Sequence, residues 1–353
     1  MNPFSHTILE WYASFGRDLP WRRTKDPYAV WLSEIILQQT RVVQGTAYWH
    51  RFLERFPTVE ALAHASEDEV LRLWEGLGYY SRARNLHAAA RQIVAMGGFP
   101  RTLEGIHSLK GVGPYTAAAI GSICFGLPAA VVDGNVYRVL ARHFGLATPV
   151  GTVQAQKEFS ALAGKLLPPE DPAAFNQGMM DFGAIQCTPL RPNCEACPLQ
   201  GSCQAFRTGR VALLPVKKSA PKVVERHFCY LYLRVPMPGG GFQTAIRRRG
   251  SGDIWQGLWE PLVLEPWAAD ASASSVSALD VSAPSLPGHA VPLRMGVRHQ
   301  LTHRKLIVDF YLLEALERPT LPDGYIWIPE SSLDQYAKPR LFELLLESVN
   351  ACK

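Results

Sequence analysis

Hydrophobic and polar positions follow two different patterns along the chain. From residue 1 to about 205, apolar side chains recur every three or four residues, which is the period of helices packed through one face. The pattern predicts helices near residues 4–16, 29–45, 46–56, 67–75, 82–96, 114–125, 134–145, 153–166 and 172–186. Because the joints between them are short and rich in Gly, Pro or Asp, we expect a mainly α-helical region.

The pattern changes after a stretch rich in Pro and Lys at residues 213–222. Beyond it, strands are predicted at 228–235, 242–246, 293–297 and 306–312, and an amphipathic helix at 341–349. Residues 268–287 are rich in Ala, Ser and Pro and predict a loop. We therefore predict a helical region over residues 1–212, a linker over 213–225 and an α+β domain over 226–353.

Composition narrows the class of protein only a little. The 353 residues suffice for two domains. No apolar run reaches the roughly 18 residues of a membrane span, and residues 1–11 lack the features of a signal peptide, so we expect a cytoplasmic protein with no membrane partner. The net charge of +5 fits a polyanionic partner, but many enzymes without one carry a similar charge.

The most informative motif begins with the glycine turn Gly111-Val112-Gly113. Glycines permit backbone conformations closed to other residues and a close approach to a ligand. Pro114 then suits the first turn of a helix, whose free N–H groups suit a phosphate oxygen. A carboxylate, Asp133, follows twenty residues after Gly113. This combination suggests chemistry on a nucleic acid, although Asp133 taken alone is better explained as the cap of the next helix.

Four of the seven cysteines lie close together, with the spacing Cys-x6-Cys-x2-Cys-x5-Cys. They are Cys187, Cys194, Cys197 and Cys203. In a cytoplasmic protein such a cluster indicates a metal centre more often than disulfides. Structural zinc sites usually pair two short Cys-x2-4-Cys knuckles, and only one is present. The spacing favours a [4Fe–4S] cluster, with zinc and unliganded thiols as the alternatives.

Glu34 lies in an apolar run that predicts a helix reaching Arg41, with Gln38 and Arg41 on the same side as Glu34. A lone glutamate on a helix is ordinarily solvated. Here the Trp, Ile and Leu neighbours indicate partial burial, which would raise the carboxyl pKa and make Glu34 a usable general acid near neutral pH.

These motifs together resemble a known superfamily. Leu109-Lys-Gly-Val-Gly-Pro-Tyr-Thr-Ala117, Val132-Asp-Gly-Asn-Val136 and the cysteine spacing are similar to those of the helix-hairpin-helix (endonuclease III) DNA glycosylases. Within that superfamily, residues 19–22, 31–40 and 76–85 resemble the adenine DNA glycosylase (MutY) family. The resemblance implies a mainly α helix-hairpin-helix glycosylase region with a [4Fe–4S] cluster, followed by an α+β Nudix-like domain.

The resemblance also implies an activity and its residues. The family removes adenine opposite 8-oxo-guanine or guanine in duplex DNA, through an oxocarbenium-like state that needs an acid and a carboxylate. Glu34 matches the acid that protonates N7 of the adenine, and Asp133 matches the carboxylate that stabilises the sugar cation. Tyr115 stands where lyase relatives carry a Schiff-base lysine, which implies a monofunctional glycosylase. With Asn135 it would position Asp133 and the sugar.

Further positions match residues that contact DNA or the bases. Gln39 and Tyr79 match residues that wedge beside the oxidised guanine, and Gln177 matches a residue near the adenine. For Tyr79 and Tyr80, core packing is the alternative. The complete implied set of DNA and substrate contacts is Trp21, Arg22, Leu37, Gln39, Thr40, Tyr79, Gly111, Val112, Gly113, Gln177, Thr302 and His303.

The second domain departs from the patterns it resembles. It has no glutamate-rich helix after Trp259-Glu260-Pro261, so we expect no diphosphate hydrolysis. The family reads 8-oxo-guanine with a Phe-Ser-His loop, where this chain has Leu301-Thr302-His303. The hydroxyl and imidazole are kept and the aromatic ring is lost; a polar hairpin without a ligand is the alternative. Residues 247–249, three arginines, would contact phosphates or be solvated.

Three functions follow, in order of preference. The first is an adenine DNA glycosylase of base excision repair that acts as a monomer on double-stranded DNA. The second is a thymine-mismatch or oxidised-pyrimidine glycosylase, against which the position of Glu34 and the extra domain argue. The third is a lesion-binding protein without activity, in which Asp133 is only a helix cap.

Overall fold

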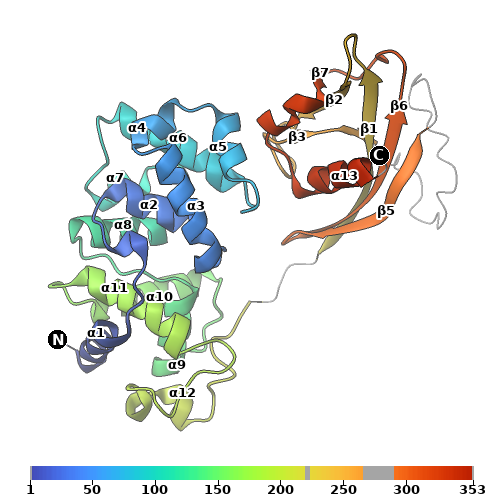
Figure 1. Ribbon diagram of the computed structural model, residues 1–353. Helices are drawn as coiled ribbons and strands as arrows, with labels where there is room; N and C mark the ends of the chain where they lie inside the picture. The colour runs from blue at the N-terminus through green and yellow to red at the C-terminus, as the bar shows by residue number, and fades with distance from the viewer. Residues whose placement is uncertain (1, 219–222, 265–289, 352–353) are drawn as a thin grey trace. The chain divides into compact units, whose positions relative to one another are not determined.

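Contacts divide the chain into two compact units, one of residues 1–64 with 85–220 and one of residues 65–84 with 221–353. The computed structural model describes residues 2–218, 223–264 and 290–351 (Figure 1). The predicted loop at 268–287 and residues 219–222 of the predicted linker lie outside them. The predicted boundaries place residues 65–84 in the helical region, whereas the structure groups them with the sheet. Ion pairs of Arg248 with Glu67 and Asp68 join the two segments.

The first unit is built from helices (Figure 1). Their bounds are α1 (Pro3–Phe15), α2 (Pro27–Ile36), α3 (Val42–Arg55), α4 (Val59–His64), α6 (Ser81–Ala95, whose first residues fall in the second unit), α7 (Leu103–His107), α8 (Pro114–Phe125), α9 (Gly134–Phe144), α10 (Val153–Leu166), α11 (Pro172–Asp181) and α12 (Gln204–Arg207). Short 3-10 turns lie at Pro20–Arg22 and Gln200–Ser202, and a π-helical turn at Phe182–Gln186. Among the described residues no helix is both long and apolar enough to span a bilayer.

Local sequence sets the ends of the helices around the predicted motif. α8 begins at Pro114 after Gly113 and ends at Gly126, which takes the left-handed conformation with φ of 64°. Asp133 caps α9, which ends at Gly145 with φ of 72°. These are the usual start and stop signals of helices, and the sequence predicts both elements to within a residue.

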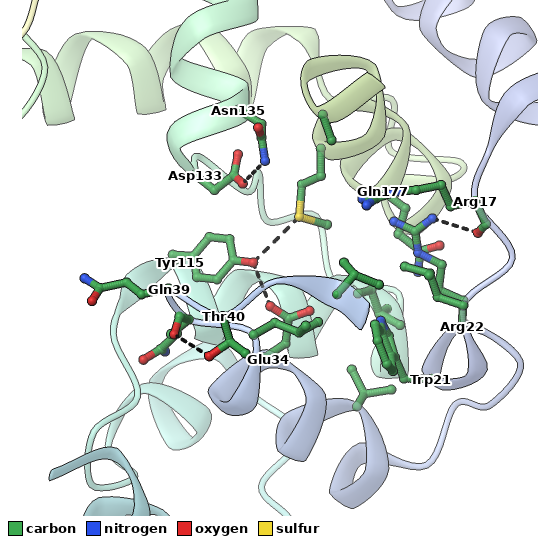
Figure 2. Close-up of a pocket in the computed structure, with 18 residues that line it drawn as sticks. Arg17, Trp21, Arg22, Glu34, Gln39, Thr40, Tyr115, Asp133, Asn135 and Gln177 are labelled. Atoms are coloured by element: carbon green, nitrogen blue, oxygen red, sulfur yellow. Dashed lines mark hydrogen bonds between the residues drawn. The ribbon is translucent and has the colours of Figure 1, made fainter. Parts of the chain in front are cut away.

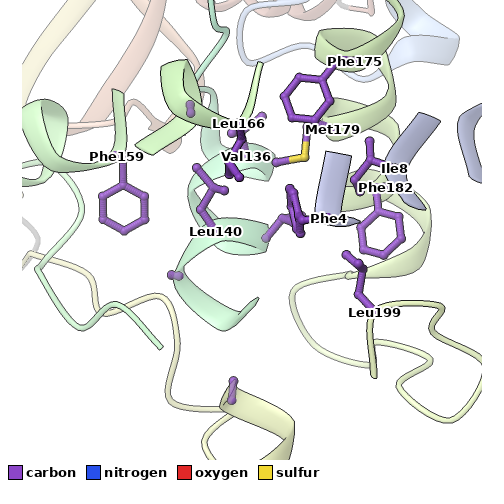
Figure 3. Packing of buried hydrophobic residues seen from close by; sticks show 14 of the residues in the cluster. Phe4, Ile8, Val136, Leu140, Phe159, Leu166, Phe175, Met179, Phe182 and Leu199 are labelled. Atoms are coloured by element: carbon purple, nitrogen blue, oxygen red, sulfur yellow. The ribbon is translucent and has the colours of Figure 1, made fainter. Parts of the chain in front are cut away.

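A buried apolar cluster joins α1, α9, α10 and α11 (Figure 3). Ile8 of α1, Leu140 of α9 and Phe175 of α11 are 0–2% exposed within it. The cluster thereby holds the start of α9 and one side of α11 in a fixed relation, and both elements supply residues to the site described below.

The prediction of one continuous helix over residues 29–45 is wrong, because the structure has two helices separated by a turn there. α2 ends at Ile36, a turn follows, and α3 begins at Val42. Gln39 in that turn has φ of 58°, outside the helical region. The Cβ that alanine would add at Gly45 of α3 would lie 2.7 Å from Leu37 Cδ2, so the leucine packs closely over this glycine. The turn therefore depends on contact between helices rather than on a proline or glycine at the break.

The second unit contains α5 (Glu67–Leu73), α13 (Arg340–Ala351) and a mixed sheet. Its strands are β1 (Val224–Pro236), β2 (Phe242–Arg248), β3 (Trp259–Glu260), β4 (Leu262–Leu264), β5 (Val291–Gln300), β6 (Arg304–Glu314) and β7 (Tyr325–Pro329). The order is β3-β2-β1-β6-β5, with β4 paired to β1 and β7 to β2; β1 and β6 are parallel. The four predicted strands are present, and the missed ones have only two to five residues.

The central strand β1 buries both of its faces. Tyr230 and Tyr232 pack in one cluster with Phe342 and Leu345 of α13, whereas Leu231 and its neighbours pack in another. Alternate side chains of a strand point to opposite faces, so this run of apolar residues is what a strand covered on both sides requires.

Candidate active site

A cavity of about 330 Å³ opens in the first unit, and it is lined by many of the predicted residues (Figure 2). This is the size at which ligand pockets begin. Its walls come from the Pro20–Arg22 turn, α2, the turn before α3, α8, the start of α9 and α11. The predicted residues on these walls are Trp21, Arg22, Glu34, Leu37, Gln39, Thr40, Tyr115, Asp133, Asn135 and Gln177.

Glu34 is buried at 8% exposure, so the alternative of a solvated helix face is wrong. The Tyr115 hydroxyl donates to Glu34 Oε2 at 2.7 Å and lies 3.7 Å from the Met180 sulfur. Burial raises the pKa of the Glu34 carboxyl, and the nearby charge of Asp133 raises it further. The hydrogen bond from Tyr115 and the charge of Arg22 oppose this rise without cancelling it. A carboxyl held in this way is suited to give up a proton near neutral pH.

Asp133 is both a helix cap and a wall of the cavity. Its Oδ1 accepts from the Val136 N–H at 2.7 Å, and its Oδ2 accepts from the Asn135 amide at 2.8 Å. Burial raises the pKa of Asp133, while these two donors and Arg138 favour its ionised form. The expectation that Tyr115 positions Asp133 is corrected, because the Tyr115 hydroxyl donates to Glu34 and Asn135 holds Asp133.

A basic wall, made of Arg17 and Arg22 around Asp181, closes one side of the cavity. Arg22 Nη1 and Nη2 donate to the Asp181 carboxylate at 2.6 and 2.8 Å, and Arg17 donates to it as well. Nearby, the Tyr12 hydroxyl donates to Gln177 Oε1 at 2.5 Å. Sequence reasoning missed Arg17 and Asp181, since no local pattern marks a carboxylate that lies about 160 positions away from its partners.

Three non-glycine residues of the described chain have positive φ: Gln39 at 58°, Tyr79 at 47° and Trp255 at 58°. Such conformations cost free energy and concentrate at functional sites. Two of the three are the residues predicted to wedge into the duplex. The backbone therefore marks Gln39 and Tyr79 independently of any resemblance.

The loop between α7 and α8 forms the predicted hairpin. Gly111 has φ of 77°, and a Cβ there would lie 2.6 Å from Asn85 Cβ, so this position needs glycine. Gly113 has an ordinary φ of −87°, which corrects the expectation that its backbone conformation demands glycine. The space beside Gly113 is open, and Val112 is buried, so the main chain is the part of this turn that a ligand could approach.

A second cavity, of about 750 Å³, lies within the second unit and gathers Tyr79, Thr302 and His303. The Tyr79 hydroxyl is hydrogen-bonded to the Thr302 hydroxyl. Tyr79 is 47% exposed whereas Tyr80 is buried, so the core-packing alternative holds for Tyr80 alone. Leu301 packs against the core of the sheet, which leaves Thr302 and His303 exposed on the hairpin.

The three arginines at 247–249 all form ion pairs, although the side chains of Arg247 and Arg248 stay 38% and 41% exposed. Arg247 and Arg249 form ion pairs with the buried Glu260, and Arg248 with Glu67 and Asp68. The sequence did not indicate these partners, which lie on β3 and α5, while the exposure of Arg248 agrees with the solvated alternative.

The four clustered cysteines follow α11, and a buried arginine organises their loop. Arg142 of α9 donates to the carbonyl oxygens of Thr188 at 2.7 Å and Pro189 at 2.9 Å, and its Nη1 lies 3.4 Å from Cys187 Sγ. Burial raises the pKa of Cys197 to about 11, and the other three thiols contribute, so all four lie within electrostatic reach of one another. In the described residues no three Cys, His, Asp or Glu side chains are arranged to hold a metal ion.

Two family matches cover both units of the chain. Residues 32–169 match the HhH-GPD superfamily of base excision DNA repair proteins, and residues 239–348 match the NUDIX domain. The Homo sapiens adenine DNA glycosylase is 35% identical over 93% of this chain and 70% of the human protein. The chain belongs to the adenine DNA glycosylase family. The Mus musculus adenine DNA glycosylase agrees, at 34% identity over 92% of this chain and 73% of its own length.

One solved structure supports the fold of the helical unit. It is a thermostable thymine-DNA glycosylase, 33% identical, with a TM-score of 0.53 over 58% of this chain and 95% of that protein. The predicted fold class, a helix-hairpin-helix glycosylase region followed by a Nudix-like domain with a mixed sheet, is confirmed. Membership of the adenine DNA glycosylase family also confirms the predicted enzyme class, a hydrolase of N-glycosyl bonds.

Proposed function

We propose that this protein is a monofunctional adenine DNA glycosylase that excises adenine opposite 8-oxo-guanine or guanine in duplex DNA. The observation that carries the proposal is that Glu34 and Asp133 line one buried cavity with different hydrogen-bond partners. The two carboxyls have different tasks in N-glycosidic hydrolysis, one giving a proton and the other facing a cation.

The residues divide the chemistry as follows. Glu34 protonates the departing adenine at N7, which makes the base a better leaving group, and then takes a proton from the attacking water. Asp133, ionised and held by Asn135 and the Val136 N–H, stabilises the positive charge that develops on the sugar. Tyr115 offers a phenol where a lyase would need an amine, so no covalent sugar adduct forms.

We assign recognition of the 8-oxo-guanine to the second cavity. Thr302 and His303 present a hydroxyl and an imidazole to the opposite base, and Tyr79 wedges into the stack beside it. The main chain at Gly111 and Gly113 binds a phosphate and sets the register on the duplex. Leu301 has no aromatic ring to stack on a base, and its side chain packs against the core of the sheet.

We assign a [4Fe–4S] cluster to the cysteine loop on the spacing of its four cysteines. The other three thiols act electrostatically on Cys197, and Arg142 ties the loop to α9. Cys187, Cys194, Cys197 and Cys203 would each ligate one iron. When bound, the cluster supplies a rigid, redox-capable centre that anchors this loop.

Excision under single-turnover conditions tests the proposed function. The purified protein should release adenine from A opposite 8-oxo-guanine faster than from A opposite G, and Glu34→Gln should lose nearly all activity. Borohydride should trap little covalent adduct with DNA. Binding without any release by the wild type would instead support a silent lesion-binding protein.

A thymine or oxidised-pyrimidine substrate is the second candidate, favoured by the similarity of the helical unit to a thymine-DNA glycosylase. Duplexes that contain a T mismatch or thymine glycol distinguish the two. Release of thymine in preference to adenine would replace the first proposal.

A further inference from the structure

Asp181 is the most deeply buried carboxylate beside the cavity, with no exposed surface. It receives the Arg17 backbone N–H and Nε at 2.8 Å each and Arg17 Nη2 at 2.5 Å, besides both terminal nitrogens of Arg22. One negative charge therefore joins two positive ones. Hydrogen bonds between charged partners are the strong ones, so this arrangement is rigid.

The place of Asp181 on its helix is unfavourable on its own. It is the last residue of α11, and the chain continues directly into the π-helical turn Phe182–Gln186, so Asp181 lies inside a helical run. A carboxylate buried there would be costly alone, and the two arginines compensate its charge. Burial opposes ionisation of Asp181, yet the hydrogen bonds from Arg22 and Arg17 outweigh it and lower its pKa.

Arg22 links the Asp181 carboxylate to Glu34, the proposed general acid. Its guanidinium lies 5.7 Å from the centre of the Tyr12 ring and acts on Glu34 electrostatically. The charged and titratable groups that face Glu34 are Tyr115 from α8, Asp133 before α9 and Arg22 from the Pro20–Arg22 turn. Of these, Arg22 is held in place by an ion pair with the fully buried carboxylate of Asp181.

We infer that Asp181 is a positioning residue for excision: it holds Arg22 beside Glu34 and cancels one of the two positive charges of the basic wall. The inference rests on the proposed function, because it assigns Asp181 a task in the step that Glu34 performs. Without Asp181 the wall would carry two uncompensated guanidinium groups, and these would favour ionised Glu34 over the protonated form that excision needs.

Two variants test the inference with shifts of opposite sign. Asp181→Asn adds one net positive charge, so the alkaline limb of the pH–rate profile should move to lower pH by roughly 0.5 to 1 unit. Arg17→Gln removes one positive charge and keeps the bond of Arg22 to Asp181, so the limb should move to higher pH. Asp18→Asn, which breaks an exposed pair with Arg23, is the matched control and should not move it.

The result that overturns the inference is an unmoved limb, or a shift of the same sign, in the two variants. If Asp181→Asn fails to fold by circular dichroism, the sign of the Arg17→Gln shift decides. Titration of the Glu34 carboxyl by ¹³C NMR, assigned by its loss in Glu34→Gln, gives the same shifts without DNA. This readout decides the inference even if the wild type releases no adenine, which would refute the proposed function alone.

Discussion

Asp133 combines a structural contact with the position proposed for its role in the reaction. Its Oδ1 caps α9 while its Oδ2 is held by Asn135 on the cavity wall. The cap and the catalytic assignment, which compete when only the sequence is considered, are compatible in the structure. Local geometry alone therefore cannot argue against a role in the reaction.

We predict that Asp133→Asn separates the two tasks. Asparagine caps a helix about as well as aspartate, so the free energy of unfolding should change by less than about 1 kcal/mol. Excision should fall by roughly a hundredfold to a thousandfold or more, since the charge that faces the sugar cation is lost. Denaturant unfolding and single-turnover excision measure the two effects.

The control for this variant is Asp171→Asn. Asp171 caps α11 through the Ala174 N–H at 3.0 Å and does not line the 330 Å³ cavity. Asp171→Asn should change the free energy of unfolding just as little and leave the excision rate unchanged. Full activity in Asp133→Asn would contradict the role proposed for Asp133.

Tyr115→Phe should change the pH dependence of excision. The Tyr115 hydroxyl stabilises ionised Glu34, so its removal should raise the pKa of Glu34 and move the alkaline limb to higher pH. The maximal rate should drop roughly tenfold, because Glu34 loses the group that orients it. Rates measured from pH 5 to 9 test this, with Tyr137→Phe as the control, since Tyr137 packs on Phe159 outside the cavity. An unmoved limb would show that the bond does not tune Glu34.

At the scale of elements, the hairpin between α7 and α8 needs only one of its two glycines for its conformation. Gly111→Ala should destabilise the protein by about 1–3 kcal/mol, because alanine would be strained at φ of 77° and would collide with Asn85. Gly113→Ala should cost less than about 1 kcal/mol, because the position is open and its φ is ordinary, and alanine is only a poorer N-cap than glycine.

The two glycine variants also test phosphate binding by the turn. If the turn approaches a phosphate through its main chain, Gly113→Ala should weaken duplex binding despite its normal stability. Affinities must be compared at one salt concentration, because phosphate contacts depend steeply on salt. Equal affinity of Gly113→Ala and wild type would remove Gly113 from the DNA contacts.

The cysteine loop is the second element with a direct test. Cys194→Ser should lower iron and acid-labile sulfide from about four of each per chain. Cys124→Ser and Cys229→Ser are matched controls, because those thiols are partly buried in other parts of the fold and should leave the metal content unchanged. Zinc in place of iron in the purified protein would contradict the cluster.

At the scale of the whole molecule, residues 65–84 belong with the sheet unit although they lie within the helical half of the sequence. Arg248 pairs with Glu67 at 3.0 Å and Asp68 at 3.2 Å, and the Lys338 backbone N–H donates to Glu75 at 2.6 Å. These contacts place the strained Tyr79 turn within reach of Thr302. We therefore expect the proposed recognition of the lesion to depend on how this segment is held.

Arg248→Glu should therefore weaken lesion preference without removing any residue of either cavity. The ratio of excision rates for A opposite 8-oxo-guanine and A opposite G should fall several-fold, because like charges then face each other across this contact. Arg294→Glu, the same charge change at an exposed position of β5, is the control. An unchanged ratio in Arg248→Glu would separate these ion pairs from lesion reading.

By itself the sequence determined the two-part architecture, most helix positions, the family and the identity of ten of the eighteen residues that line the first cavity. These depend on local signals: apolar period, caps such as Asp133, and motifs read within a few residues. The structure brings Glu34, Tyr115 and Asp133 together as the motifs imply, although they lie up to a hundred positions apart.

Only the tertiary structure decided the break after Ile36, the burial of Asp181 between two arginines, the ion pairs of residues 247–249 and the attachment of residues 65–84 to the sheet unit. Each of these depends on contacts between different elements, and most on partners far away along the chain. The free energy of a buried charge or a strained turn is set by those partners, which no local pattern encodes.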